Sequence, residues 1–323
     1  MEGRIDAGVE EDSITLRTGA QTVIEYTELT EQNLEAVHAL SNKNLDYDSV
    51  PLDIFRYKTL GDRDFDPAMT VVALSDGQPC GYMMGIARKK DEGVSAAIKC
   101  FAVDAACRNS GIASEMLSRI ETEAKSRGAG SLAVGFTRPN YLVPGVDPRY
   151  TVAAAFLLRR GFQKGGEAFN MDVDLSTSDW STAEIEARLA KDNTISRRLR
   201  PDEKERLREW MQADGFSEGW QYQVLRAADQ DPVAVFIAEK EGEIVAFSCY
   251  DGVRPGWFGP MGTTGNLRGG GIGTVTFLQC LQSMKAVGYK VCEINSVGPL
   301  YFYSKVANAV VSRLFWQFSK KLD

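Results

Sequence analysis

The sequence predicts an α/β (α+β) protein built from two similar halves, and three observations support this. Segments with the spacing of strands and of helices alternate along the 323 residues. One pattern occurs twice, a hairpin glycine followed by a loop that contains an arginine and glycines. It appears first as Gly77 and Arg108 and then as Gly242 and Arg268. The chain is also longer than one hydrophobic core usually serves. We therefore expect an internal duplication, in which each copy is a mixed, mostly antiparallel twisted sheet flanked by helices.

The first copy is expected over residues 21–175, after an N-terminal extension over residues 1–20 in which Ser13 to Arg17 alternate like a short strand. An Asp-Gly pair at 76–77 lies between two β-rich runs and indicates a tight hairpin. The expected elements are a strand at 22–28, a helix at 31–44, a helical piece near residue 51, strands at 69–74, 80–87 and 94–103, a helix from residue 112, a strand at 131–136, a helix at 149–160 and a strand at 168–175.

The second copy is expected over residues 193–323, and the charged, helical stretch at 176–192 suits a linker between the two. The order of elements restarts at Thr194 with a strand. There follow a helix at 202–212, a hairpin about residue 242, a strand near residue 258, the glycine loop at 268–273, a helix, and a strand that ends at residues 293–294.

Charge and composition exclude several classes of protein. With 37 basic and 44 acidic residues the net charge is −7, which repels nucleic-acid phosphates, so we expect no nucleic-acid partner. The six cysteines show no C-x-x-C spacing and the sequence has a single histidine, so we expect no metal site. The sequence shows neither an export signal nor an apolar run of about 18 residues. We expect a cytoplasmic protein with reduced cysteines and no membrane partner.

The two glycine loops have the pattern of an anion site. Each is expected between a strand and a helix, where unpaired backbone N–H groups and the helix dipole favour a negative charge. Glycine at the third place after each arginine lets the backbone approach a ligand closely, and the arginine adds a positive charge. A dinucleotide site of the Rossmann type would need its glycines after the first strand, whereas both loops here follow the fourth. The loops therefore predict a phosphate site that needs no metal.

The pattern R-x-x-G-x-G/A in these loops resembles the acetyl-CoA pyrophosphate loop of the GNAT superfamily of N-acetyltransferases. The resemblance covers nearly the whole chain at the level of the fold, and it implies two tandem GNAT folds with acetyl-CoA as co-substrate. In the first copy the matching residues are Arg108, Gly111 and Ala113. In the second copy the resemblance assigns cofactor binding to the loop and the end of the strand before it: Met261, Gly262, Thr263, Arg268, Gly269, Gly270, Gly271, Ile272 and Gly273.

Acetyl transfer to an amine needs a proton for the departing thiolate, and a tyrosine hydroxyl can give it. The GNAT resemblance places this tyrosine on the helix after the fifth strand, where the second copy has Tyr303, although a tyrosine in so aromatic a run can also be a packed core residue. The first copy has Leu157 at that place, with Tyr150 about two helical turns earlier. It also has Ala105 where many family members have proline. We therefore expect a degenerate first copy and a catalytic second copy with Tyr303 as general acid.

The sequence defines the general base less well. Glu293 on the expected fifth strand, Asp251, and Glu218 in an expected loop at 215–220 are candidates, and each can also be a solvated carboxylate. A chain of water molecules could serve instead.

The expected acceptor is a primary amine of a small molecule. Tandem GNAT proteins that the chain resembles include glucosamine and glucosaminide N-acetyltransferases and, more distantly, mycothiol synthases, so an amino sugar such as glucosamine is one acceptor to test. Other amines stay open: an aminoglycoside-like or mycothiol-precursor-like molecule, or a peptide N-terminus. Two other classes also stay open, a non-catalytic acyl-CoA-binding sensor and a peptidyltransferase that uses aminoacyl-tRNA, although both arginine loops argue against the latter. The acyl chain length and the oligomeric state are left undetermined by the sequence.

Overall fold

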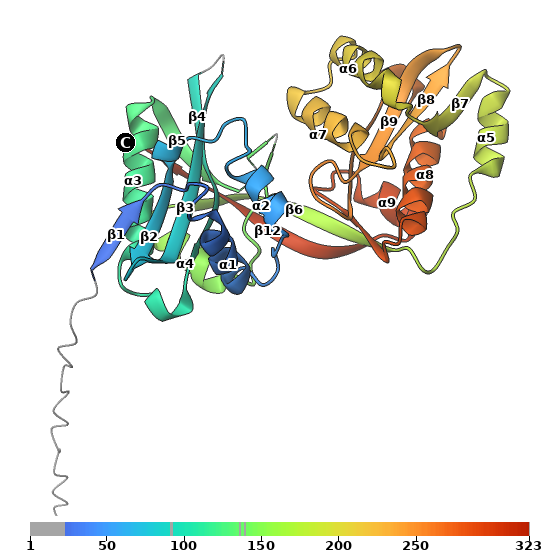
Figure 1. Cartoon of the computed structure of the whole chain (residues 1–323). Helices are drawn as coiled ribbons and strands as arrows, with labels where there is room; N and C mark the ends of the chain where they lie inside the picture. Colours follow the sequence, from blue (N-terminus) through green and yellow to red (C-terminus); the bar gives the residue numbers. More distant parts are fainter. Residues whose placement is uncertain (1–22, 91–92, 136, 139, 323) are drawn as a thin grey trace, which may run out of the picture.

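The computed structural model describes residues 23–322 except 91–92, 136 and 139. The expected extension at 1–20, with its short strand at 13–17, lies outside the described residues. Figure 1 shows two lobes, the N-terminal half in blue to green and most of the C-terminal half in yellow to red, connected by the long strands β6 and β12. The predicted α/β class with a mostly antiparallel sheet flanked by helices is confirmed.

The N-terminal half follows the predicted order of elements, and its hairpin turns tightly at the predicted glycine. Asp76 and Gly77 both have positive φ, at 51° and 75°, which is the geometry of a two-residue hairpin turn that favours glycine. The elements are β1 (Ile24–Thr27), α1 (Leu34–Asn44), α2 (Leu52–Lys58), β2 (Thr70–Ser75), β3 (Gln78–Lys90), β4 (Gly93–Val103), α3 (Ile112–Ser126), β5 (Ala129–Val134), α4 (Thr151–Arg159) and β6 (Gln163–Asp174).

The C-terminal half repeats this order, and Glu241 and Gly242 form the matching turn with φ of 54° and 86°. The predicted linker contains a short helix. This helix packs against the C-terminal lobe, so the segment does more than connect the two lobes. The elements are α5 (Ala183–Ala190), β7 (Thr194–Arg198), α6 (Lys204–Ala213), α7 (Glu218–Ala228), β8 (Val235–Lys240), β9 (Glu243–Tyr250), β10 (Trp257–Thr263), α8 (Ile272–Ala286), β11 (Val291–Ile294), α9 (Leu300–Ala307) and β12 (Val310–Lys321).

The loop expected at 215–220 ends earlier than predicted, because a helix begins inside it. Ser217 is the N-cap of α7, and its hydroxyl accepts a hydrogen bond from the backbone N–H of Trp220 at 3.4 Å. Serine is a favoured N-cap because its oxygen satisfies an otherwise unpaired donor of the first turn. Glu218 is therefore the first residue of a helix and not part of a loop.

Within the described residues, twelve strands form one sheet in the order β1, β2, β3, β4, β5, β12, β6, β11, β10, β9, β8, β7. The strand β12 is not among the predicted elements. It is the last element of the C-terminal half, yet it lies between β5 and β6 of the N-terminal half, antiparallel to both. In turn, β6 pairs with β11 of the C-terminal half. The two halves thus exchange strands at the centre of the sheet.

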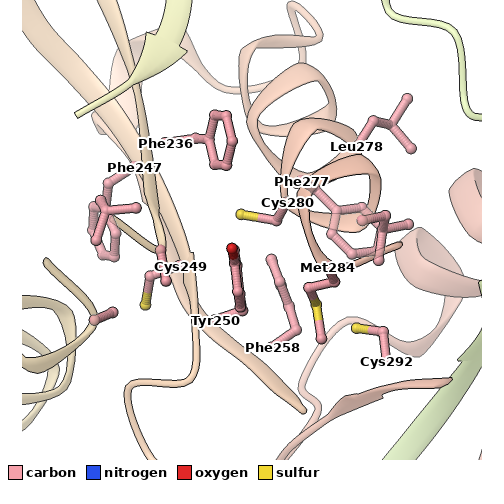
Figure 2. Close-up of a cluster of buried hydrophobic side chains, with 14 of the residues drawn as sticks. Phe236, Phe247, Cys249, Tyr250, Phe258, Phe277, Leu278, Cys280, Met284 and Cys292 are labelled. Atoms are coloured by element: carbon pink, nitrogen blue, oxygen red, sulfur yellow. The ribbon is translucent and has the colours of Figure 1, made fainter. Parts of the chain in front are cut away.

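Helices cover both faces of the sheet and enclose separate hydrophobic cores. In the N-terminal half, one face of α3 is buried against the sheet through residues at the predicted helical spacing: Ile112, Met116, Leu117, Ile120 and Ala124. Figure 2 shows the core of the C-terminal half, where Phe258 of β10 meets Phe277 of α8 with ring centroids 4.7 Å apart. Burial of each such large apolar side chain contributes about 1.5–3 kcal/mol to folding.

Candidate functional site

The two glycine loops have nearly the same backbone conformation. Asn109 and Gly269 have φ of 63° and 87°, and Gly111 and Gly271 have φ of 87° and 91°. Each of the last two residues is the N-cap of the helix that follows, in the left-handed region that favours glycine. The predicted strand, glycine loop and helix order is therefore present in both halves.

The two loop arginines are also held in the same way. Nε of Arg108 donates to the carbonyl oxygen of Val103 at 3.1 Å, and Nε of Arg268 donates to that of Thr263 at 3.2 Å. Each arginine thus fastens its loop to the end of the preceding strand. In the first half, Nη2 of Arg108 also donates to the side-chain oxygen of Asn44 at 3.1 Å. The arginine supplies loop geometry in addition to positive charge.

A cavity of about 920 Å³ opens beside the N-terminal loop. Its position follows from the sheet: β5 pairs in parallel with β4 only as far as Ile98, opposite Val134. Beyond that pair the two strands no longer pair, and the rest of β4 from Lys99 to Val103 lines the cavity together with Gly135. The volume is in the range of ordinary small-molecule and cofactor sites.

The cavity reaches the phosphate loop, and the loop presents an open backbone to it. Arg108, Gly111 and Ala113 line the cavity, as do the exposed arginines Arg159 and Arg160 at the end of α4. A Cβ atom placed on Gly111 would have no atom within 4 Å. Free backbone N–H groups at a helix N-terminus with nearby guanidinium groups fit the phosphates of a CoA molecule.

Tyr150, the N-cap residue of α4, also lines this cavity. Its hydroxyl accepts a hydrogen bond from the backbone N–H of Tyr47 at 2.9 Å, and the two rings lie 5.4 Å apart. Burial raises the pKa of Tyr150, and the neighbouring carboxylate of Asp48 raises it further. A hydrogen bond with the Asp48 side chain also raises this pKa, so the hydroxyl stays protonated at neutral pH.

The strand edge at the cavity carries a buried ion pair and a buried thiol. Lys99 is the extra residue of a β-bulge in β4, and it forms an ion pair with Asp62 in which both side chains are fully buried. Burial raises the pKa of the Cys100 thiol to about 11. A thiol that stays protonated at neutral pH is a poor nucleophile.

The C-terminal loop is covered by the linker helix α5. Nη2 of Arg188 donates to the carbonyl oxygen of Gly270 at 3.0 Å, and the same guanidinium occupies the position that a Cβ atom on Gly271 would take. Ile185 of the same helix lies 3.6 Å from that position. The loop of the copy that is expected to be catalytic is therefore less open than its N-terminal counterpart.

The strand residues expected to bind cofactor in the second copy are closely packed. A Cβ atom on Gly262 would lie 2.5 Å from the ring of Phe216, and one on Gly273 would lie 3.1 Å from the side chain of Met261 and 3.3 Å from that of Thr263. Ile272 is buried in a small core beneath α5. These contacts occupy the surface of β10 and of the first turn of α8.

Tyr303 lies in the core of the C-terminal half. Its side chain is 7% exposed, and its ring packs edge-on against Phe302, Phe277 and Phe258 at 5.0, 5.3 and 6.1 Å. Burial raises its pKa. It does not line the cavity beside the N-terminal loop. This environment matches the packing role that the sequence left open for it.

Glu293 lies on the face of β11 opposite to the core that holds Tyr303. Its neighbour Cys292 belongs to that core, and successive side chains of a strand point to opposite faces. Both oxygens of Glu293 are occupied, since Asn170 and Trp257 donate to them at 2.5 and 2.8 Å. The structure therefore does not bring Glu293 and Tyr303 to one point.

The other two carboxylates considered as bases are each held by partners of their own. Glu218 is 75% exposed and pairs with Arg63 of the N-terminal half at 2.7 Å, and this hydrogen bond lowers its pKa. Asp251 accepts hydrogen bonds from the N–H of Gly256 at 2.7 Å and the hydroxyl of Tyr289 at 3.0 Å, while burial raises its pKa.

Two general features of the described residues also bear on the sequence predictions. None of their helices combines the length and apolar character needed to cross a membrane. Nor do they contain a group of three or more His, Cys, Asp or Glu side chains placed to hold a metal ion.

Comparison with known proteins agrees with the fold. The model of the acetyltransferase (GNAT) family matches residues 29–142. The chain resembles the glucosamine N-acetyltransferase region of a fungal multi-domain β-N-acetylglucosaminidase, at 17% identity and a TM-score of 0.75, over 93% of this chain but only 38% of that one. It also resembles a tandem GNAT protein of the clavulanic acid pathway, at 14% identity and a TM-score of 0.66, over 93% and 99% of the two chains.

A GNAT protein from Sphaerobacter thermophilus is similar at 14% identity and a TM-score of 0.62, over 93% of this chain and 96% of that one. At such identities the likeness shows the fold alone. The comparison with curated protein sequences gave no match. The fold is therefore that of the acetyltransferases. The GNAT family model matches part of the N-terminal half, and the chain as a whole has the fold of the tandem GNAT proteins.

Proposed function

We propose that the chain is an acetyl-CoA-dependent N-acetyltransferase that acts on a primary amine of a small molecule, and that the reaction takes place in the N-terminal cavity. The observation that carries this proposal is that one cavity is lined by the open glycine loop, the unpaired edge of β4 and Tyr150. The sequence alone favours the C-terminal copy, whose loop the guanidinium of Arg188 covers.

The residues of the cavity divide into groups that suit the parts of such a co-substrate. The loop from Asn109 to Ala113 would bind the pyrophosphate through its backbone N–H groups, with Arg159 and Arg160 close to the phosphates. The unpaired edge of β4 at 99–103 offers backbone hydrogen-bonding groups to an extended amide chain. Bound acetyl-CoA supplies the activated acetyl group for attack by the amine.

Tyr150 is the proton donor in this proposal. When the nitrogen of the acceptor bonds to the acetyl carbon and the carbon–sulfur bond breaks, the thiolate that leaves requires a proton. Tyr150 is protonated at neutral pH, and its raised pKa keeps it so where a free tyrosine would ionise. The N–H of Tyr47 supports the oxygen that becomes negative after transfer. The proton that the amine loses passes to solvent and restores the tyrosine.

The assignment of Tyr303, with Glu293 or Glu218 as base, stays a prediction for the C-terminal copy. The glycine loop at 268–273 supports it, since its backbone has the conformation of the N-terminal loop. The burial of the Tyr303 ring among three phenylalanines argues for a packing role. The two assignments predict different variants to be inactive, so kinetics can separate them.

Amino sugars are the first acceptors to test. The glucosamine N-acetyltransferase region that shares this fold supports that choice, although the identity of 17% is too low to transfer a substrate. We propose a release assay for free thiol with acetyl-CoA and a panel of amines, which includes glucosamine, an aminoglycoside and a peptide with a free N-terminus. Thiol release that depends on the amine supports an acetyltransferase. Tight CoA binding without release for any amine would instead indicate the acyl-CoA sensor.

The location of the reaction is tested with Arg108→Ala beside Arg268→Ala. Because Arg108 fastens the open loop, its loss is expected to weaken CoA binding and lower kcat/KM by about tenfold or more, a loss of roughly 1.4 kcal/mol in transition-state stabilisation. Arg268→Ala should keep most of the activity. The reverse result, with both variants folded by circular dichroism, would place the reaction in the C-terminal copy.

A further inference from the structure

We propose that Arg313 on β12 is a positioning residue for the N-terminal cavity: it fastens the loop at 45–51 to the loop at 144–150 and so sets the place of the Tyr150 hydroxyl. This proposal rests on the proposed function, because it concerns the same cavity. It assigns to the last strand of the C-terminal half a part in a site whose other residues all belong to the N-terminal half.

The backbone of β12 directs Arg313 toward the cavity loops. The register of β12 on β6 shifts between Val311, which faces Met171, and Arg313, which faces Asn170. One residue, Ser312, is thus extra on the β12 side, and such a β-bulge bends a strand and turns the following side chain to a new direction. The hydroxyl of Ser312 donates to the carboxylate of Asp172 at 2.7 Å, which holds the bulge in place.

The guanidinium of Arg313 joins two loops that are far apart in sequence. Nη1 donates to Oδ1 of Asp48 at 2.8 Å and to the carbonyl oxygen of Tyr47 at 3.1 Å. Nε and Nη2 both donate to Oδ2 of Asp147, at 3.1 and 2.9 Å. Tyr47, Asp48 and Asp147 all line the cavity. A planar guanidinium with several fixed donors can make this set of bonds, whereas a lysine ammonium cannot match its geometry.

The burial of these groups makes the connection strong. The side chain of Arg313 is 11% exposed, and those of Asp48 and Asp147 are 5% and 2% exposed. Burial alone would raise the pKa of Asp147, but hydrogen bonds from Arg149 and Arg313 lower it overall. Removal of the Arg313 charge would leave buried Asp48 without its ion-pair partner and Asp147 with Arg149 alone, which disfavours this arrangement of the loops.

The backbone of the second loop is attached to β12 as well. Val146 and Trp316 form an isolated antiparallel bridge with two backbone hydrogen bonds of 2.8 Å. Arg313 therefore adds a side-chain contact close to a backbone contact on the same strand. The loop at 144–150 is consequently placed by β12 and not only by the elements adjacent to it in sequence.

The contact reaches the proposed donor through the backbone of one residue, Tyr47. Arg313 binds the carbonyl oxygen of Tyr47, and the N–H of Tyr47 binds the hydroxyl of Tyr150. The ring of Tyr47 lies under the guanidinium of Arg149, 3.6 Å from its centroid. Loss of Arg313 should free the first loop and let the hydroxyl move, and small displacements of a reacting group slow catalysis strongly.

The test compares Arg313→Gln and Arg313→Lys with Lys320→Gln in the full chain. Lys320 is the matched control, because it lies on the same strand and pairs with Glu121 of α3 at 2.7 Å, away from the loops. We expect Arg313→Gln to lower kcat by about tenfold or more while the affinity for CoA changes less than about twofold, as for an interaction used mainly in the transition state. Arg313→Lys should recover part of the loss, and Lys320→Gln should match the wild type.

Two further measurements separate positioning from a general loss of stability. Arg313→Gln combined with Tyr150→Phe should be no slower than Tyr150→Phe alone, because a positioning effect acts through that hydroxyl. Hydrogen exchange should increase in the loops at 45–51 and 144–150 and not in α3. Full additivity, unchanged exchange in both loops, or an equal loss in Lys320→Gln would overturn the proposal. If Tyr150→Phe leaves turnover unchanged, the proposed proton donor is wrong, and exchange still decides whether Arg313 fastens the loops.

Should Arg313→Gln not fold, Arg313→Lys carries the same test. It keeps the charge but not the fork of donors, so it should still show faster exchange in the two loops and a lower kcat. A wild-type kcat together with wild-type exchange in Arg313→Lys would then overturn the proposal.

Discussion

Gly135, which directly follows β5, lies against Gly145 of the next loop so closely that a Cβ atom on Gly135 would stand 2.7 Å from the Cα of Gly145. Gly135 also has a φ of 76°, in the region that favours glycine. Gly145 is equally confined, because its own Cβ would lie 2.7 Å from the carbonyl oxygen of Trp316 on β12. Three backbone segments thus meet without side chains at the wall of the cavity.

We expect Gly135→Ala to destabilise the protein and to lower its activity. The added methyl group meets backbone atoms that cannot move aside cheaply, and a non-glycine residue with positive φ costs about 1–3 kcal/mol. Gly130→Ala is the matched control, since this exposed residue of β5 has no atom within 4 Å of its Cβ position. Denaturant unfolding measures both variants. Equal stability of the two would show that the contact relaxes at little cost.

Calorimetry is expected to find one CoA bound per chain. The N-terminal loop is open, whereas Arg188 covers the C-terminal loop. Gly111→Glu should abolish this binding by placing a negative side chain in the loop, and Gly271→Glu should leave it intact. Two binding events in the wild type would mean that α5 moves away from the second loop.

Phenylalanine substitutions distinguish the two candidate proton donors. Tyr150→Phe should lower kcat by about tenfold or more with little change in CoA affinity, because it removes only a proton and a hydrogen-bonding oxygen. Tyr303→Phe removes a buried hydroxyl from an aromatic core and should leave kcat nearly unchanged. Steady-state kinetics on both variants decides the matter. The opposite pattern would restore the assignment made from the sequence.

The pH profile should show no loss of activity from Tyr150 up to about pH 10, the ordinary pKa of tyrosine. Its raised pKa means that the hydroxyl remains protonated where a free tyrosine would begin to ionise. The rate should rise with pH at first, as more of the acceptor amine loses its proton. A fall of kcat well below about pH 10 in the wild type that disappears in Tyr150→Phe would contradict the raised pKa.

Much of the fold could be predicted because local rules act within each element. The turns at Gly77 and Gly242 follow from residues that accept positive φ, and the buried face of α3 follows from apolar spacing. The helix α7 begins inside a segment interpreted as a loop, where Ser217 is the local signal for the change. The strand β12 could not be placed, because its partners β5 and β6 are distant in sequence.

The site was predictable only in part, for a similar reason. The loop conformations follow from glycine and asparagine at fixed places, and both loops show them. Arg188 decides which of the two loops is open. The contact of Arg188 with Gly270 is a tertiary contact, and the spacing of residues along the sequence does not reveal it. The family pattern does not point to Tyr150, because this residue lies too early in the chain. The run of proline and glycine before it was the available signal that this loop could fold back over the strands.

The insertion of β12 also sets the order in which the protein can assemble during synthesis. Domains commonly fold as units from the N-terminus while the chain is still being made. Here β5 and β6 gain their shared neighbour only after the C-terminal half has been translated. Until then the N-terminal lobe exposes two strand edges at its centre, which are sites for pairing with other chains. We therefore expect the nascent lobe to depend on chaperones, and to aggregate when translation stops before β12.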